Sequence, residues 1–389
     1  MKVLIFTASA GNGHNSTAKR IREKILKHDS KAEIKIVDTY ESYASRIKAW
    51  TMSKGYCFAC NHLLPAYNYF FKKAEKDSES NKKRRINKKI KSLPSGMLNE
   101  IYDFQPDLII STYIFNTVAL AEIKRNHHIP AKIMCMTLDY GISPYWEKGA
   151  EVLDYMFLTD DYMIETFLKK GYKKEQLISS GIPVGEQFSH TLDRKEASKA
   201  VGLDPDMFTV VIMKASFFPV SNQKIINELK KVEKTLQVVI INGNNKKVTN
   251  DFAKRLKGAN LHHKVINLGF TNQVVEYFSV ADLVIGKAGG LSTTETINSG
   301  VPSIILDKLP QQEIYNKNYL VDNGCALSTT KNEIAKNLNY LLNNPDEYNR
   351  LKANTLKLRK IDTLNMIYDI IKTVPKADYS GLKKNKDVI

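Results

Sequence analysis

Short apolar runs alternate with helical patterns along most of this chain, and this alternation is the feature that most restricts its fold. Runs such as Val3–Phe6 and Val238–Ile241 are typical of strands buried on both faces of a parallel sheet. Between the runs, apolar residues recur at helical spacing, as they do in residues 16–27. Strands separated by helices predict an α/β protein with parallel sheets covered by helices.

The alternation falls into two sets, and 389 residues are more than one ordinary core holds. The sequence therefore predicts two Rossmann-like domains whose parallel sheets face each other across a cleft. We expect a hinge at Gly181–Gly185. The predicted parts are an N-terminal domain at 1–184 with an insertion at 40–95, helices at about 350–372 that complete this domain, a C-terminal domain at 185–349 and a flexible tail at 373–389.

Two glycine-rich turns follow strands and precede helices. Gly11-Asn12-Gly13-His14 comes after the first strand, and Gly286-Lys287-Ala288-Gly289-Gly290 comes after the strand at 283–286. Glycines let the backbone approach an anion closely, and the free N–H groups of a helix start point at it. In open α/β sheets, ligands bind beyond the carboxyl ends of strands. Both turns thus favour phosphate binding, with Asn12, Gly13, Gly289, Gly290, Leu291 and Ser292 as the expected substrate contacts.

Polar residues near the second turn leave two interpretations open. Glu295 is placed to bind ribose hydroxyls, but Ser292-x-x-Glu295 also fits a capping box, which by itself is the favoured interpretation. Gln312 and Glu313 begin a later helix with Asn316 one turn on. An amide beside a carboxylate suits sugar hydroxyls. Glutamate at a helix start is also explained by its favourable interaction with the positive end of the helix dipole.

Taken together, these motifs resemble those of GT-B glycosyltransferases, in particular the monogalactosyldiacylglycerol synthase and processive diacylglycerol glucosyltransferase family. The resemblance covers most of residues 1–345. It rests on the second glycine turn with Glu295 and the Gln312-Glu313 pair, and on three N-terminal stretches: Thr7–His14 with Ala18, Gln105–Thr112, and Thr159-Asp160 followed by Ser180–Val184.

The resemblance implies a hexosyltransferase that joins glucose or galactose from a UDP-sugar to the hydroxyl of diacylglycerol or a glycosyldiacylglycerol. It implies inversion of the anomeric centre and no metal or other cofactor. Gly289, Gly290 and Leu291 would surround the diphosphate, Glu295 would hold the ribose, and Gln312 with Glu313 would hold the hexose.

His14 would face the acceptor hydroxyl, and the residue type suits a general base because histidine titrates near neutral pH. A helix-capping or diphosphate-contacting role for His14 is an equal alternative. Asp139 is a second candidate, either to orient His14 or to replace it as base.

The chain departs from the family pattern at three places. Asp139 is displaced by one residue in Thr137-Leu138-Asp139, and Gln311 stands where the family has a loop glycine. Lys214–Pro219 replaces a glycine-rich turn, so Lys214 is a candidate diphosphate contact. Phe270, just after the strand at 265–268, is a further candidate for substrate binding.

The net charge of +17 is concentrated in one segment, where residues 72–91 contain ten Lys or Arg against three acids. Aromatic residues crowd the stretch just upstream. Rings beside cations suit a membrane interface with anionic lipids, while a solvated basic helix over ordinary core aromatics is the equal alternative. The predicted membrane-binding residues are Trp50, Phe70, Phe71, Lys82, Lys83, Arg84 and Arg85.

No apolar run reaches the ~18 residues of a membrane span, and Met1–Ala10 does not resemble a signal peptide. We therefore expect a cytoplasmic protein attached peripherally to the inner face of the cell membrane. The rival hypotheses are a glycosyltransferase with a polyprenyl-linked acceptor, a non-catalytic nucleotide binder, and a nucleic-acid binder, which rests on charge alone and is not expected.

Overall fold

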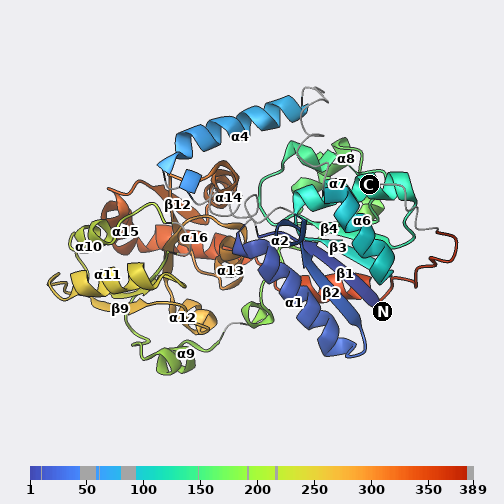
Figure 1. The fold of residues 1–389 in the computed structure, drawn as a ribbon. Coiled ribbons are helices and arrows are strands. Elements are labelled where there is room, and N and C mark those ends of the chain that lie inside the picture. Colours follow the sequence, from blue (N-terminus) through green and yellow to red (C-terminus); the bar gives the residue numbers. More distant parts are fainter. Residues whose placement is uncertain are drawn as a thin grey trace. The chain divides into compact units, whose positions relative to one another are not determined.

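The structure is a computed structural model that describes residues 1–9, 11–43, 58–60, 62–79, 93–147, 149–190, 192–214 and 218–382. The chain divides into two compact units, each with its own sheet (Figure 1). The first unit comprises Met1–Phe58, Pro65–Val184 and Asp362–Ile389, and the second comprises Ala59–Leu64 and Gly185–Ile361.

The first unit contains a six-stranded sheet in the order β2-β1-β3-β4-β5-β6, and all of its strand pairs are parallel. Its central strands are buried on both faces, which explains why the sequence shows continuous apolar runs rather than alternation. The strands are β1 (Lys2–Thr7), β2 (Glu33–Asp38), β3 (Leu108–Ser111), β4 (Lys132–Met136), β5 (Tyr155–Leu158) and β6 (Leu177–Ser179).

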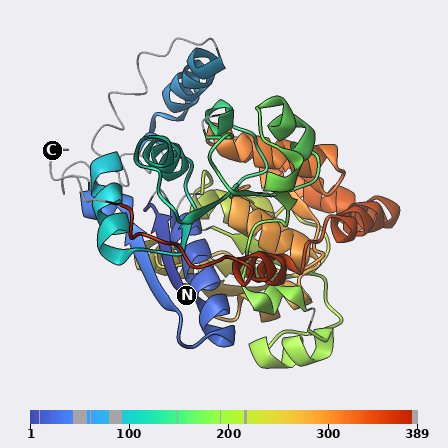
Figure 2. The same cartoon turned by 90° about the vertical axis from the view of Figure 1, so that its right-hand side faces the viewer.

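Helices follow the strands of the first unit and include one contributed by the C-terminal part of the chain. They are α1 (Asn12–His28), α2 (Thr39–Tyr43), α4 (Leu64–Glu79), α6 (Leu93–Phe104), α7 (Ile114–His127), α8 (Met163–Lys169) and α17 (Thr363–Ile371), with 3-10 turns η1 (Pro144–Glu147) and η2 (Lys174–Gln176). Helix α17 packs on α1, where Tyr368 stacks on His28 with ring centroids 4.5 Å apart. Figure 2 shows the segment after α17 passing the strands of this unit, where the hydroxyl of Tyr379 donates to the carbonyl of Pro106.

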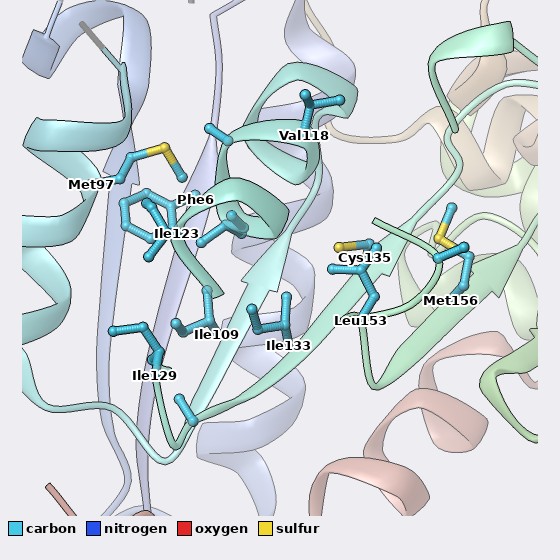
Figure 3. Close-up of a cluster of buried hydrophobic side chains, with 14 of the residues drawn as sticks. Phe6, Met97, Ile109, Val118, Ile123, Ile129, Ile133, Cys135, Leu153 and Met156 are labelled. Atoms are coloured by element: carbon cyan, nitrogen blue, oxygen red, sulfur yellow. The ribbon is translucent and has the colours of Figure 1, made fainter. Parts of the chain in front are cut away.

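One hydrophobic core lies between the first sheet and the helices that cover one of its faces, among them α6 and α7. Figure 3 shows Phe6, Ile109, Ile133 and Met156 from successive strands in this cluster. Helices α6 and α7 cover these side chains with their own apolar residues, among them Met97 and Ile123. Each fully buried side chain of this size contributes about 1.5–3 kcal/mol relative to exposure.

The second unit contains another six-stranded parallel sheet, in the order β12-β11-β10-β7-β8-β9. The predicted fold class, two Rossmann-like α/β parts with parallel sheets, is confirmed. The strands are β7 (Thr209–Met213), β8 (Gln237–Ile241), β9 (Lys264–Leu268), β10 (Leu283–Gly286), β11 (Ser303–Leu306) and β12 (Ala326–Thr329). The helices are α9 (Arg194–Val201), α10 (Asn222–Leu229), α11 (Lys246–Leu256), α12 (Val274–Val280), α13 (Gly290–Asn298), α14 (Gln311–Asp322), α15 (Ile334–Asn343) and α16 (Pro345–Lys357), with the 3-10 turn η3 (Glu186–Ser189).

The strand orders give each sheet one point where the direction of winding reverses. In the first sheet the reversal lies between β1 and β3, and in the second it lies between β7 and β10. Loops diverge at such a point and leave room for a ligand at the carboxyl ends of the strands. Each glycine-rich stretch follows a strand at a reversal point: Gly11 follows β1, and Gly289 follows β10.

Candidate active site

Helix α1 begins at the first glycine-rich stretch, earlier than the sequence pattern predicted. Gly11 is its N-cap with φ 114°, a left-handed conformation that favours glycine. The helix starts at Asn12, so Gly13 and His14 belong to its first turn rather than to a loop before it. The expected start at Ser16 was wrong because the polar residues 12–15 carry no apolar periodicity. No side chain caps this helix start, so its first N–H groups have no intrahelical partner.

His14 is held by the backbone of the neighbouring loop after β3. Its Nδ1 lies 2.6 Å from the carbonyl oxygen of Thr112. A carbonyl oxygen only accepts, so Nδ1 carries the hydrogen and a neutral ring has its lone pair on Nε2. Burial lowers the pKa of His14 from 6.5, and the hydrogen bond to Thr112 and the charge of Asp38 only partly oppose this. The geometry therefore favours a neutral imidazole with a basic Nε2.

An aromatic side chain packs against the His14 ring. Tyr113 meets it edge-on, with centroids 4.9 Å apart and planes at 72°. The hydroxyl of Tyr113 lies 2.6 Å from that of Tyr40, in α2. Burial raises the pKa of Tyr113 well above its usual value, and the nearby hydroxyls of Tyr40 and Tyr67 raise it further. Tyr113 is thus uncharged, and its ring packs against the imidazole and restricts it to its observed orientation.

Asp38, at the end of β2, organises the loop that leads to His14. Its carboxylate accepts hydrogen bonds from the hydroxyl and the backbone N–H of Ser9 and, at 3.0 Å, from Nδ2 of Asn15. The other side-chain atom of Asn15, Oδ1, accepts from Thr7 at 2.7 Å. Burial raises the pKa of Asp38, but the hydrogen bonds from Ser9 and Asn15 outweigh it and lower the pKa below 3.8. The sequence pattern gave no indication of this role, because it depends on contacts between separate segments.

Asp139, the other candidate base, follows β4. Its backbone carbonyl accepts a hydrogen bond from Oγ1 of Thr159 at 2.9 Å, and its side chain is partly exposed. Its role in catalysis stays a prediction.

In the second unit, α13 begins at the second glycine-rich stretch. Gly289 is the N-cap in an extended conformation, and no side chain caps the helix. The capping box favoured from the sequence is therefore wrong. Ser292 is the third residue of the helix, and its Oγ donates to the carbonyl of Gly289 at 3.0 Å. Glu295 lies a turn further on and is partly exposed. The first amides of α13 have no intrahelical partner, which is the condition for an anion site at a helix start.

Helix α14, which follows the neighbouring strand β11, contacts this turn through two side chains. Nδ2 of Asn316 donates to the carbonyl of Ala288 at 2.8 Å, and Glu313 forms an ion pair with Lys287. Oε2 of Glu313 is buried and has no hydrogen-bond partner. The two charged groups converge on Gly289, where a methyl group would lie 3.6 Å from Nζ of Lys287 and 3.8 Å from Oε1 of Glu313. Sequence reasoning singled out Glu313 and Asn316 but missed Lys287, which stands inside the motif itself.

The remaining substrate candidates of the second unit lie in different surroundings. Gln312 is partly exposed beside the buried Gln311, whose Oε1 has no partner. Phe270 follows β9 and is 64% exposed. Lys214 follows β7 and is buried, with its ammonium on Asn222 and over the ring of Phe252. Burial lowers the pKa of Lys214 to about 8. Direct contact of these residues with substrate stays a prediction.

Helix α4 carries the described part of the predicted membrane-binding segment. Tyr69 and Phe70 are 63% and 65% exposed, whereas Phe71 is partly buried and packs against Tyr67. Exposed lysines lie on the same helix at positions 72, 73 and 76. Trp50 and the basic residues Lys82, Lys83, Arg84 and Arg85 lie outside the described residues. In the part of the chain that the structure describes, no helix is long and apolar enough to cross a bilayer.

Across the described ranges, no three side chains of His, Cys, Asp or Glu are gathered as potential ligands of one metal ion.

Two family models match successive parts of the chain. Residues 14–184 match monogalactosyldiacylglycerol (MGDG) synthase, and residues 216–373 match the glycosyltransferase family 28 C-terminal domain. The chain is 26% identical to the processive diacylglycerol beta-glucosyltransferase of Bacillus subtilis (strain 168) over 377 residues, which is 95% of each chain. It is 27% identical to the enzyme of the same name from Staphylococcus carnosus (strain TM300) over 331 residues, or 83% of this chain and 80% of that protein.

Solved structures show the same fold at low sequence identity. MurG of Acinetobacter baumannii aligns with a TM-score of 0.62 at 12% identity, covering 96% of this chain and 99% of that one. The Anabaena protein Alr3699/HepE in complex with UDP aligns with a TM-score of 0.54 at 14% identity, covering 96% and 100%. Fold, site and matches together define a GT-B glycosyltransferase. Its parts match the monogalactosyldiacylglycerol synthase model and the glycosyltransferase family 28 C-terminal model, and most of its length is similar to processive diacylglycerol beta-glucosyltransferases, in agreement with the resemblance of its motifs.

Proposed function

We propose that this enzyme transfers a hexose from a UDP-sugar to the hydroxyl of diacylglycerol, or of a glycosyldiacylglycerol, at a membrane surface. The transfer proceeds with inversion and without a metal ion. Glucose is the favoured hexose because the curated relatives are named beta-glucosyltransferases, and galactose is the alternative because of the name of the matching family model. The single observation that carries the proposal is the Nε2 of His14, left basic by the hydrogen bond from Nδ1 to Thr112.

The donor site of the proposal lies at the start of α13. The uncapped amides after Gly289 and the positive end of the helix dipole suit a diphosphate. The structure of the Anabaena neighbour in complex with UDP supports a uridine nucleotide as the ligand of this protein. Glu295 is assigned to the ribose, and Gln312 with Glu313 to the hexose.

The acceptor site of the proposal lies at the start of α1. As the acceptor oxygen attacks the anomeric carbon, Nε2 of His14 takes the hydroxyl proton. The bond between the anomeric carbon and the phosphate oxygen breaks, and UDP leaves with the bonding electron pair. A single displacement inverts the anomeric centre. The amides at the start of α13 stabilise the charge that develops on UDP, which is the work a metal ion would otherwise do.

The membrane part of the proposal rests on α4. Exposed aromatic rings at positions 69 and 70 beside exposed lysines form a surface that suits the headgroup region of anionic lipids. The Tyr67 hydroxyl of the same helix is close enough to raise the pKa of Tyr113, which packs on His14. The helix that would meet the bilayer therefore neighbours the proposed base. We assign the enzyme to the inner face of the cell membrane as a peripheral protein.

The test is UDP release by the purified protein. Vesicles with anionic lipid and diacylglycerol are mixed with UDP-glucose or UDP-galactose in excess chelator, and vesicles without diacylglycerol serve as the control. The expected result is diacylglycerol-dependent release and a β-linked product, identified by its anomeric NMR coupling. Release with neither donor would refute the activity. Transfer only to a polyprenyl-linked acceptor would favour the rival acceptor.

A further inference from the structure

We propose that Lys287 is a positioning residue for the donor sugar: its ammonium holds one oxygen of the Glu313 carboxylate, so that the other oxygen is presented to the hexose. This inference rests on the proposed function, because it takes a UDP-hexose as the ligand of the second unit. It adds a role for Lys287 and explains how a buried carboxylate is kept in one orientation.

The first observation is the ion pair itself. The Nζ of Lys287 contacts Oε1 of Glu313, and the two side chains are only 15% and 6% exposed. A carboxylate this deeply buried is kept charged by a paired cation. With one oxygen bound to the ammonium, the carboxylate cannot rotate freely, and the direction of its second oxygen is set.

The second observation is the unsatisfied atom. Oε2 of Glu313 is buried without a hydrogen-bond partner. Buried polar atoms normally have a hydrogen-bond partner, because a buried polar atom without one costs free energy of folding. A carboxylate oxygen only accepts, so the missing partner is a donor. The hydroxyl of a hexose is such a donor. Because hexoses differ in the orientation of their hydroxyls, a contact to one hydroxyl would allow the site to distinguish between sugars.

The third observation is where the pair stands. A methyl group at Gly289 would lie within 3.8 Å of both Nζ of Lys287 and Oε1 of Glu313. Gly289 is the N-cap of α13, the expected diphosphate position. The hexose is bonded to the diphosphate, so the carboxylate of Glu313 lies near the place where the sugar of a bound donor is expected.

The same contacts argue against Lys287 as a direct ligand of the diphosphate. Its ammonium already neutralises Glu313, so the pair carries no net charge to attract an anion. The uncapped α13 amides supply that attraction instead. Lys287 therefore acts on the sugar through Glu313, and its loss is expected to weaken UDP-hexose binding without weakening UDP binding.

The experiment compares the full-length wild type with Lys287→Met by calorimetric titration of UDP, UDP-glucose and UDP-galactose, together with KM and kcat for UDP-glucose. We expect the affinity for the hexose donor to fall at least ~10-fold, the loss of one good hydrogen bond to a charged group, and the affinity for UDP to change less than about twofold. Lys287→Arg keeps the cation and should restore part of the loss. Lys308→Met removes an exposed lysine before α14 and is the matched control for charge.

Glu313→Gln tests the open oxygen independently, and it carries the test if Lys287→Met fails to fold. Its amide oxygen keeps the contact to Lys287, while an NH₂ donor replaces the accepting Oε2. We expect the same selective loss of hexose affinity, and no further loss in the double variant.

Two results would overturn the inference while leaving the proposed function intact. In the first, Lys287→Met weakens UDP and UDP-glucose equally, which would make the lysine a diphosphate ligand. In the second, Lys287→Met and Glu313→Gln bind both ligands as the wild type does. A wild type that binds neither UDP nor a UDP-hexose would overturn the proposed function and this inference together.

Discussion

The ring of His14 and the carbonyl of Thr112 join the first turn of α1 to the loop after β3, at the reversal point of the first sheet. The distance from Nδ1 to the carbonyl oxygen is 2.6 Å, across 98 positions of the sequence. Helix α1 follows β1 and Thr112 follows β3, and these strands are neighbours in the sheet. The hydrogen bond selects one tautomer of the ring, and it therefore decides which nitrogen is able to act as a base.

The first prediction concerns the pH dependence of turnover. The pKa of His14 is lowered from 6.5, so the base is already neutral at pH 7 and loses activity only as it becomes protonated below 6.5. The acidic limb of kcat/KM against pH should have a pKa below 6.5. His14→Ala should lower kcat by ~10²-fold or more while UDP affinity is unchanged.

The matched control is His28→Gln, at the other end of the same helix, which should leave turnover unchanged. An acidic limb above 6.5, or near-normal turnover of His14→Ala, would make His14 structural and move attention to Asp139.

A second prediction concerns Asp38, whose negative charge raises the pKa of His14. Asp38→Asn removes that charge, so the acidic limb of the profile should move to lower pH. The variant also replaces an accepting oxygen with a donor against Ser9 and Asn15, and this should reduce the free energy of unfolding by about 1–3 kcal/mol.

Both effects are measured on one preparation, by kinetics and by urea unfolding. Asp369→Asn, on α17 of the same unit, serves as the control because its pair with Lys372 is exposed. A shift of the acidic limb to higher pH would contradict the prediction.

The third prediction tests the approach of the diphosphate to α13. Gly289 has φ −72°, so Gly289→Ala introduces no backbone strain. Its methyl group would lie 3.2 Å from Oγ of Ser292 and would occupy the face of the N-cap. UDP affinity should fall at least ~10-fold, or about 1.4 kcal/mol, by calorimetry. At Gly258 a methyl group meets nothing within 4 Å, so Gly258→Ala should bind UDP normally. Equal UDP affinities of Gly289→Ala and Gly258→Ala would refute the placement of the diphosphate at Gly289.

The fourth prediction tests α4 as a lipid-binding surface. Replacing Tyr69 and Phe70 with serine should weaken binding to anionic vesicles about 10-fold or more in a sedimentation assay, because apolar area is lost from the interface. UDP affinity should not change. Tyr340→Ser, a similarly exposed aromatic position on α15, is the control.

The sequence adds that reversing the charges of Lys82–Arg85 should weaken vesicle binding, more strongly at low salt. Unchanged vesicle binding of the variant with serine at positions 69 and 70 would refute α4 as the lipid-binding surface.

The fifth prediction concerns stability and His263. The Nε2 of His263 lies 2.8 Å from the carbonyl oxygen of Leu229, and Nδ1 accepts from the N–H of Leu236, so the folded protein needs the neutral ring. Burial, with a smaller effect of His262, lowers the pKa of His263 from 6.5. Its contribution to stability is therefore present above pH 6.5 and is lost as the pH falls below it, with a slope of at most about 1.4 kcal/mol per pH unit.

Urea unfolding between pH 7.5 and 5.5 measures this slope. His263→Gln should flatten the pH dependence, whereas His190→Gln, at an exposed position of the same unit, should keep it. An unchanged slope in His263→Gln would assign the pH dependence to other groups.

Much of the fold was predictable because its strands are buried on both faces. A strand such as β10 must then be apolar throughout, and a run of apolar residues can be recognised without knowing its neighbours. Helix starts were harder to place. The polar residues at the beginnings of α1 and α13 carry no periodicity, and backbone angles at Gly11 and Gly289 decided where each helix begins.

The sequence by itself determined that two parallel sheets form and that each is followed, at a strand end, by a glycine-rich helix start. These features depend on residue type and local spacing, which the chain carries in its own order. Only the tertiary structure decided that Thr112 selects the tautomer of His14 and that Lys287 faces Glu313. Each pair joins a helix start to a loop that follows another strand, and the partners meet because strand order, which no local pattern encodes, places the ends of those strands side by side.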